Sequence, residues 1–258
     1  ALLDAAIADA ADLILVHHGY FWRGEAAPLV GMKGRRIRSL VRADASLLAY
    51  HLPLDAHPEL GNNRQLGRRL GFGQAGVLDG LLWGVELAEP ISTAALSARI
   101  DAALHRTPLV IGEGTQLHRI AWCTGAAQGL IEQAAELGCD AFISGEVSEQ
   151  TVHQARELGI DYLAAGHHAT ERYGVQALGD ELAGRFGYSR CARGFGFDGG
   201  VRRTHQDLGG RFRDRIGLGL HPVIAKMRGP YLGRIGLAQR IHLFSQAPRC
   251  RNTIQTQN

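Results

Sequence analysis

The feature that most constrains the fold is a unit that occurs three times: a helix-forming stretch, an Asp, and an apolar run ending in Gly, His or Glu. The copies are "LLDAAIADAADLILVHHG", "LIEQAAELGCDAFISGE" and "ARELGIDYLAAGHH". Apolar residues at helical spacing, followed by runs of four or five apolar residues, are typical of helices alternating with buried, mostly parallel strands. The stretch "MKGRRIRSLVRADASLLAYHLPLD" has the same order. The pattern predicts an α/β protein.

The repeated units fall into two groups along the chain. We predict two similar α/β lobes with mostly parallel sheets, residues 1–72 and 118–187, joined by a connecting insertion, residues 73–117. The insertion contains a predicted helix near residues 91–105, with Ser92 or Thr93 as its N-cap. In open parallel sheets, ligands bind beyond the carboxyl ends of the strands, so residues that follow the strands are the first candidates for a site.

The charge divides the chain near residue 188. Residues 188–258 contain 13 Arg or Lys and 3 Asp, whereas residues 1–187 contain 15 basic and 22 acidic residues, a net charge of −7. The tail, residues 188–258, is rich in Arg and Gly and has no sustained apolar period. Its composition is typical of a disordered nucleic-acid-binding arm or of a shifted reading frame of GC-rich DNA; the third alternative is a domain of unfamiliar pattern. We predict no site residue in it.

Size and composition favour a globular protein rather than a membrane protein. The chain has 258 residues, and no apolar run approaches the roughly 18 residues of a membrane span. The four cysteines lack the spacing of a disulfide framework or a CxxC metal site, so we expect a reducing, cytoplasmic location. Because the chain begins with Ala inside a helical stretch, we also expect the first lobe to lack its start.

Two adjacent histidines, His17 and His18, follow the apolar run at residues 13–16. Beyond the last hydrogen bond of a strand, the chain can turn both imidazoles into one cleft, and neutral imidazole is a common ligand of divalent metals. In the alternative interpretation, one histidine lies in the core and the other in solvent, because adjacent strand residues point to opposite faces.

A second candidate is the stretch "GHHATERYG", which follows an apolar strand and opens a helix. His167 and Glu171, at positions i and i+4, would project from one helical face about one turn apart. That spacing suits two ligands of one metal, or a carboxylate that bridges two metals. The alternative is a histidine that caps the helix and a solvated glutamate.

Asp55 closes the predicted strand "LLAYHLPLD", after Pro53 and before the turn-rich "PELGNN". An Asp in this position can simply bond loop amides. Taken together, however, the strand ends supply three imidazoles and two carboxylates, enough for two metal ions that share a carboxylate. Glu146 and His168 also follow strands and are candidates to orient ligands or transfer protons; the alternative is that each caps its adjacent helix.

Five stretches carry a resemblance to a known family: "VHHGYFWRGE", "HLPLDAHPELGNN", "AWCTG", "FISGEVSEQT" and "AAGHHATER". From residue 1 to about 187, the chain resembles the bacterial dinuclear-metal proteins called GTP cyclohydrolase 1 type 2 homologues. These form the Nif-three-like family, and the YbgI branch is the most similar. Relatives begin with a further helix, loop and strand, so we expect an uncovered sheet edge here. They also end soon after the position of residue 187, usually with one more strand that the tail does not resemble.

The resemblance implies a Nif-three-like fold of two similar lobes and a ring-shaped homohexamer whose metal sites face the interior. It also implies two divalent metal ions per chain. The residues that correspond to the family's ligands are His17, His18, Asp55, His167 and Glu171.

From these observations we expect a metal-dependent hydrolase that acts on a nucleotide or a related small molecule, with Glu171 or Asp55 as the bridge between the metals. Nitrogen and oxygen ligands without thiolate suit Zn, Fe, Mn, Ni or Mg. The family name implies GTP ring opening. Residues 1–187 lack a GxxxxGK[ST] phosphate loop, and the turn "CTGAAQG" is a candidate for cradling phosphate or simply a tight turn.

Two other functions are open at the level of sequence. One is a non-catalytic metal carrier or hexameric scaffold, which would store or deliver ions or recruit a partner. The other is nucleic-acid association through the opening of the ring, which the net charge of −7 on residues 1–187 opposes.

Overall fold

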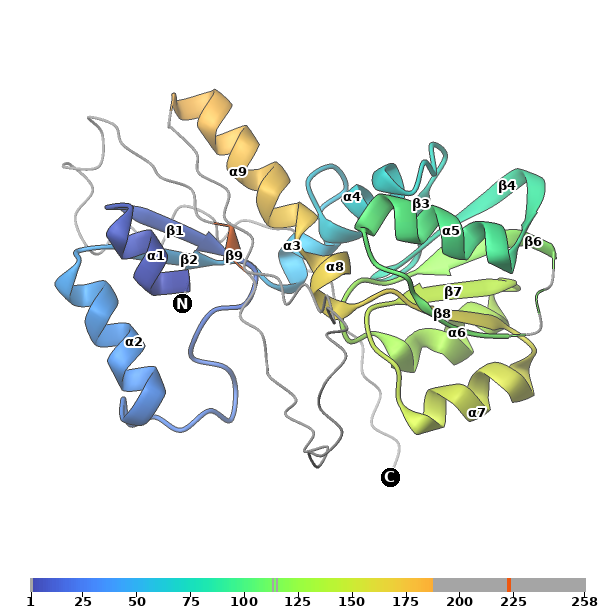
Figure 1. Ribbon diagram of the computed structural model, residues 1–258, viewed down its shortest axis with the longest axis horizontal. Coiled ribbons are helices and arrows are strands. Elements are labelled where there is room, and N and C mark those ends of the chain that lie inside the picture. The colour runs from blue at the N-terminus through green and yellow to red at the C-terminus, as the bar shows by residue number, and fades with distance from the viewer. Residues whose placement is uncertain (1, 113, 115, 188–221, 224–258) are drawn as a thin grey trace, which may run out of the picture. The chain divides into compact units, whose positions relative to one another are not determined.

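The computed structural model describes residues 2–112, 114, 116–187 and 222–223, all within one compact unit, Ala1–Met227. Helices and strands alternate along most of this unit (Figure 1). The elements are α1 (Leu2–Ala8), β1 (Leu13–Val16), α2 (Gly31–Arg42), β2 (Ser46–Ala49), α3 (Leu52–Ala56), α4 (Asn62–Arg69), β3 (Gly76–Asp79), β4 (Leu82–Ser92), α5 (Thr93–Leu104), β5 (Leu109–Ile111), β6 (Gln116–Trp122), η1 (Gln128–Leu130), α6 (Ile131–Glu136), β7 (Ala141–Ser144), α7 (Glu149–Leu158), β8 (Asp161–Ala164), α8 (His167–Glu171), α9 (Tyr173–Phe186) and β9 (Pro222–Val223).

The smaller sheet has the strand order β2-β1-β9, in which β1 pairs in parallel with β2 and antiparallel with β9. All four residues of β1 are buried, because both faces of the strand are covered. Ile14 and Val16 pack with α1 and α2, whereas Leu15 packs with Leu54 of α3 and Val175 of α9. The apolar run before the two histidines is therefore the central strand of a covered sheet.

The larger sheet has the order β3-β4-β6-β7-β8-β5. Its centre, β6-β7-β8, is parallel, while β3, β4 and β5 pair antiparallel with their neighbours. Alternate residues of β6 supply two cores: Ile120 and Trp122 pack on the side of α4 and α5, and Ala121 faces α6 and α7. This alternation follows from the two-residue period of a strand.

The α/β fold predicted from the repeated unit is confirmed, and the predicted helix near residues 91–105 is α5. Ser92 is its N-cap, and the Ser92 hydroxyl accepts a hydrogen bond from the Ala95 amide. The larger sheet has the predicted parallel strands at its centre and antiparallel strands toward its edges. A tight turn at Gly80 (φ 55°) folds β3 and β4 into a hairpin, and β4 and β5 pair antiparallel with β6 and β8. Residues 73–117, predicted as a connecting insertion, contain β3, β4 and β5 of this sheet, and the predicted domain boundaries stay predictions.

The prediction that Asp55 closes a strand is wrong, because β2 ends at Ala49 and Asp55 lies in α3. Pro53 explains the difference: a proline in the first turn of a helix loses no intrahelical hydrogen bond and fixes a helical φ.

The predictions for residues 188–258 lie outside the described residues, apart from the pairing of β9 with β1. Within the described residues, no helix is both long and apolar enough to span a membrane.

Candidate metal centre

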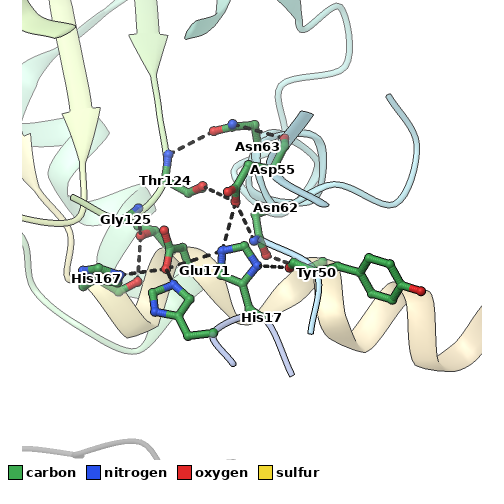
Figure 2. A network of polar contacts seen from close by, with 12 residues as sticks. His17, Tyr50, Asp55, Asn62, Asn63, Thr124, Gly125, His167 and Glu171 are labelled. Atoms are coloured by element: carbon green, nitrogen blue, oxygen red, sulfur yellow. Dashed lines mark hydrogen bonds and ion pairs between the residues drawn. The ribbon is translucent and has the colours of Figure 1, made fainter. Parts of the chain in front are cut away.

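Side chains that follow strands of both sheets meet in one group of histidines and carboxylates (Figure 2). Two of them directly follow β1, two lie at or within α3 after β2, and two belong to α8 after β8. This placement at the carboxyl ends of parallel strands is where α/β sheets bind ligands. We call this group the ligand cluster: His17, His18, His51, Asp55, His167 and Glu171.

The cluster contains three overlapping sets, each with ligand atoms within 4.8 Å of one another. Glu171 belongs to two of the sets, and so do His17 and His18. The sets are His17, His18 and His51; His18, His167 and Glu171; and His17, Asp55 and Glu171. Nitrogen and oxygen atoms at this spacing could hold a divalent metal ion.

Glu171 lies at the centre of the cluster. Its Oε2 atom is 2.7 Å from Nε2 of His167, 3.0 Å from Nε2 of His18 and 3.8 Å from Nε2 of His17. The side chain is buried, so its charge must be balanced by these neighbours or by a cation. One carboxylate oxygen therefore faces three imidazoles.

The hydrogen bonds of His17 provide a direct test of whether a cation fits. Nδ1 of His17 donates to the carbonyl of Tyr50 over 2.7 Å, which leaves a lone pair on Nε2 when the ring is neutral. That lone pair faces Oδ1 of Asp55 at 3.4 Å and Oε2 of Glu171 at 3.8 Å. His17 is fully buried, so the electron-rich atoms require a positive charge between them, a proton or a metal ion.

Asp55 is oriented by side chains from α4 and from the end of β6. Oδ1 of Asp55 accepts a hydrogen bond from the Asn62 amide at 2.8 Å and lies 3.5 Å from the Thr124 hydroxyl. Asn63 joins the same network, because its side chain donates to the Asp55 carbonyl and accepts from the Thr124 amide. These buried contacts hold the carboxylate toward His17 as supporting residues hold metal ligands.

Gly125 makes room for Glu171. A Cβ atom at this position would lie 1.7 Å from Oε1 of Glu171, and the backbone has φ of 72°. Both the close approach and the left-handed conformation require glycine. The turn "CTGAAQG", considered above as a phosphate cradle, thus contributes Thr124 and Gly125 to the packing of the two carboxylates.

His167 lies between two carboxylates. Its Nδ1 atom is 2.7 Å from Oε1 of Glu146, and its Nε2 atom is 2.7 Å from Oε2 of Glu171. The hydrogen bond with Glu171 raises the pKa of His167 to about 9, against the opposing effect of burial. The contact with Glu146 fixes the orientation of the His167 ring, and the role predicted for Glu146 beside the ligands stays a prediction.

The buried charges shift other pKa values in the directions that the contacts require. Burial favours neutral Glu171, but the hydrogen bonds from His167 and His18 outweigh it and hold the Glu171 pKa well below its ordinary value. Burial also opposes the charged form of His17, yet Asp55 and Glu171 raise its pKa above the usual value. These shifts describe a site that attracts positive charge.

His51 is the member of the cluster that the sequence analysis missed. Its ring centroid lies 5.0 Å from those of His17 and His18. Burial and the two neighbouring histidines lower its pKa, which favours the neutral imidazole that binds metals. His51 and Asp55 are four residues apart at α3, as His167 and Glu171 are at α8, and this shared i, i+4 spacing was the available signal.

The structure brings together all five predicted ligands and Glu146. His168 lies on α8, but among the described residues the three ligand sets do not include it. Asn62 and Asn63 were not predicted as site residues, and Thr124 and Gly125 were considered only as part of a candidate phosphate-binding turn. Their contacts with the cluster arise from the tertiary fold.

The fold and the cluster define an α/β protein with two buried carboxylates, one buried histidine and three partly buried histidines that could hold metal. The chain belongs to the Duf34/NIF3 (NGG1p interacting factor 3) family, whose model matches residues 1–191. This confirms the resemblance drawn from the five sequence stretches.

Individual proteins similar to this chain agree with the family assignment. The GTP cyclohydrolase 1 type 2 homolog of Allochromatium vinosum is 61% identical over 191 residues, which covers 72% of this chain and 75% of the relative. A solved structure of protein ybgI, described as of unknown function, has 49% identity and a TM-score of 0.67, covering 71% of this chain and 75% of that one. A crystal structure of a protein from Thermus thermophilus has 33% identity and a TM-score of 0.67, covering 72% of this chain and 76% of that one.

Proposed function

We propose that the chain binds two divalent metal ions and is a metal-dependent hydrolase of a nucleotide or a related small molecule. The observation that carries the proposal is the position of Glu171, whose Oε2 atom faces His18 and His167 of one ligand set and His17 of another. A carboxylate in this position is suited to bridge two ions. The proposed ligands are His17, His18, Asp55, His167 and Glu171.

The remaining side chains have supporting roles in this proposal. Asn62 and Thr124 orient Asp55, Glu146 orients His167, and Gly125 leaves space for the Glu171 carboxylate. When bound, two divalent ions held by these ligands would lower the pKa of bound water and polarise a phosphoryl group or an electrophilic carbon. His18 and His167 are partly exposed, so a substrate can approach the cluster from their side.

The nucleotide substrate is proposed from the name of the relatives, GTP cyclohydrolase 1 type 2 homolog. A cytoplasmic location remains part of the proposal; the buried free thiols of Cys123 and Cys139 are compatible with it.

The proposal is tested by turnover of a nucleotide panel that includes GTP, using the full chain loaded separately with Zn, Fe, Mn, Ni and Mg. We expect hydrolysis with at least one metal and a loss of at least about 100-fold in Glu171→Gln, because removal of a bridging charge weakens both ions. Glu149→Gln, on the first turn of α7, is the matched control and should retain activity.

Equal turnover in Glu171→Gln and the unmodified chain would contradict the paired-metal hydrolase. Bound, exchangeable metal without turnover of any nucleotide would instead support the metal carrier or scaffold.

A further inference from the structure

Trp22 lies beside the ligand cluster with part of its indole exposed. The centroid of its ring is 4.8 Å from that of His51 and 5.8 Å from that of His18, both in T-shaped contacts. The residue is nevertheless 44% exposed. The other two tryptophans of the chain, Trp83 and Trp122, are buried in the core of the larger sheet.

The loop that carries Trp22 is held by several polar contacts. The Glu25 carboxylate accepts hydrogen bonds from the backbone amides of Phe21 at 2.8 Å and Trp22 at 3.1 Å, and it pairs with Lys33 at 3.0 Å. These bonds hold Phe21 at a φ of 66°, a conformation that non-glycine residues rarely adopt. At Gly19, where the loop leaves β1, a Cβ atom would lie 2.5 Å from Cβ of Ala49. The aromatic loop, residues 19–25, is therefore preformed.

The polar edge of Trp22 is already used within this loop. Its indole Nε1 donates to the carbonyl of Gly19 at 3.1 Å. What the exposed part of the ring offers to a ligand is therefore an apolar π surface. Phe21 is also exposed, and its ring contacts Tyr20 and Lys33 among the residues that the structure describes.

We propose that Trp22 is a substrate-binding residue that stacks on a planar heteroaromatic ring, such as a nucleotide base, beside the proposed metal site. A preformed indole next to the cluster can hold the flat part of a substrate while another part reaches the metals. An aromatic side chain can stack on any flat base, so this contact would select a class of substrates rather than one particular base. The inference rests on the proposed metal function and narrows its substrate to a molecule with such a ring.

Intrinsic tryptophan fluorescence of the metal-loaded full chain tests the inference directly. Because Trp83 and Trp122 are buried, quenching by an added base reports mainly on Trp22. We expect GTP and ATP to quench the emission, and inorganic triphosphate, which has no ring, to leave it unchanged. In calorimetry, Trp22→Ala should weaken GTP binding roughly 5- to 100-fold, while Trp22→Phe retains most of the affinity.

Phe21→Ala is the matched control, because it removes a neighbouring exposed ring that does not face the cluster, and it should bind GTP like the unmodified chain. Metal content and circular dichroism of each variant separate a lost stacking contact from a lost fold or metal site. Equal GTP affinity in Trp22→Ala overturns the inference and leaves the proposed function intact. A metal-loaded chain that binds neither nucleotide overturns both the inference and the proposed nucleotide substrate. Acrylamide quenching of the nucleotide-free protein gives a further test. If Trp22 is shielded from acrylamide because it lies between two copies of the chain, its ring is not available to a ligand and the inference is overturned.

Discussion

At the scale of single residues, the site depends on two buried carboxylates that face buried nitrogen atoms. Asp55 and Glu171 are both almost fully buried, and Nε2 of His17 lies within 4 Å of each. Charges in such a setting are stable only when they are paired, hydrogen-bonded or bound to a cation. Small changes in the space around either carboxylate should therefore alter metal affinity.

Gly125→Ala is the sharpest test of that space. The new Cβ would overlap Oε1 of Glu171, and the positive φ adds strain of about 1–2 kcal/mol, so we expect lower stability and reduced metal binding. Gly129→Ala lies in the same turn but has open space around the new Cβ, so we expect it to change neither the stability nor the metal binding. Thermal unfolding and metal analysis of both variants decide the matter, and a Gly125→Ala protein with unchanged metal content would contradict the role of this glycine.

Metal affinity should rise with pH. In the metal-free protein, the pKa of His167 is raised from 6.5 to about 9, so its contribution to stability is full below pH 6.5 and is lost as the pH rises through 9. The pKa of Glu171 is lowered from its ordinary value of 4.5. Its charged form therefore contributes to stability above pH 4.5, and this contribution is lost as the pH falls below that value. Because a metal must displace the proton of His167, calorimetry should show affinity increasing from pH 6.5 to 9 with proton release. Affinity independent of pH over this range would argue against His167 as a ligand.

Sequence reasoning found the residues whose signals are local. His17 and His18 are adjacent, and His167 and Glu171 share one helical face, so short-range geometry suffices to pair them. Asn63 and Thr124 are 61 residues apart and meet through one hydrogen bond, which no local pattern encodes. His51 was missed because a single histidine after a strand gives little signal by itself.

At the scale of elements, short helices after strands place the ligands. α3 and α8 each span five residues, and each carries a carboxylate four positions after a histidine. The repeated helix–Asp–strand unit predicted the parallel strands β1, β7 and β8. It did not predict the order of the larger sheet, because the antiparallel partners of β4 and β5 come from contacts distant in sequence.

The N-cap of α5 offers a prediction at this scale. Ser92→Ala removes the hydroxyl that accepts from the Ala95 amide, so we expect a loss of about 1 kcal/mol in the free energy of unfolding. Ser97→Ala, inside the same helix, should not destabilise the protein, since Ala has the higher helix propensity. Chemical denaturation measures the free energy of unfolding of both variants. An equal change in the two variants would contradict the capping role of Ser92.

At the scale of the whole molecule, we predict assembly into a homohexamer, as the family resemblance implies. β5 is an edge strand of the larger sheet, and its Leu109 and Val110 are exposed. The opposite edge, β3, carries the charge of Asp79, which disfavours pairing with another sheet edge. The exposed apolar edge of β5 is the better candidate for a contact between copies.

Sedimentation velocity tests this prediction. We expect a species of about six times the 27.9 kDa chain mass, and a shift toward smaller species in Leu109→Lys. Val77→Lys, at an exposed position on β3, is the matched control and should not change the assembly. A monomer in the unmodified protein would contradict the predicted hexamer, and identical behaviour of the two variants would exclude β5 as the contact.

We propose that the ligand cluster holds two metal ions bridged by Glu171. Metal content per chain, measured by plasma mass spectrometry on the full chain beside Glu171→Gln and Glu149→Gln, tests it most directly. We predict about two divalent ions per chain, unchanged in Glu149→Gln and reduced to less than one in Glu171→Gln. A folded, unmodified protein that binds no divalent metal, or a Glu171→Gln variant that keeps both ions, would contradict the claim.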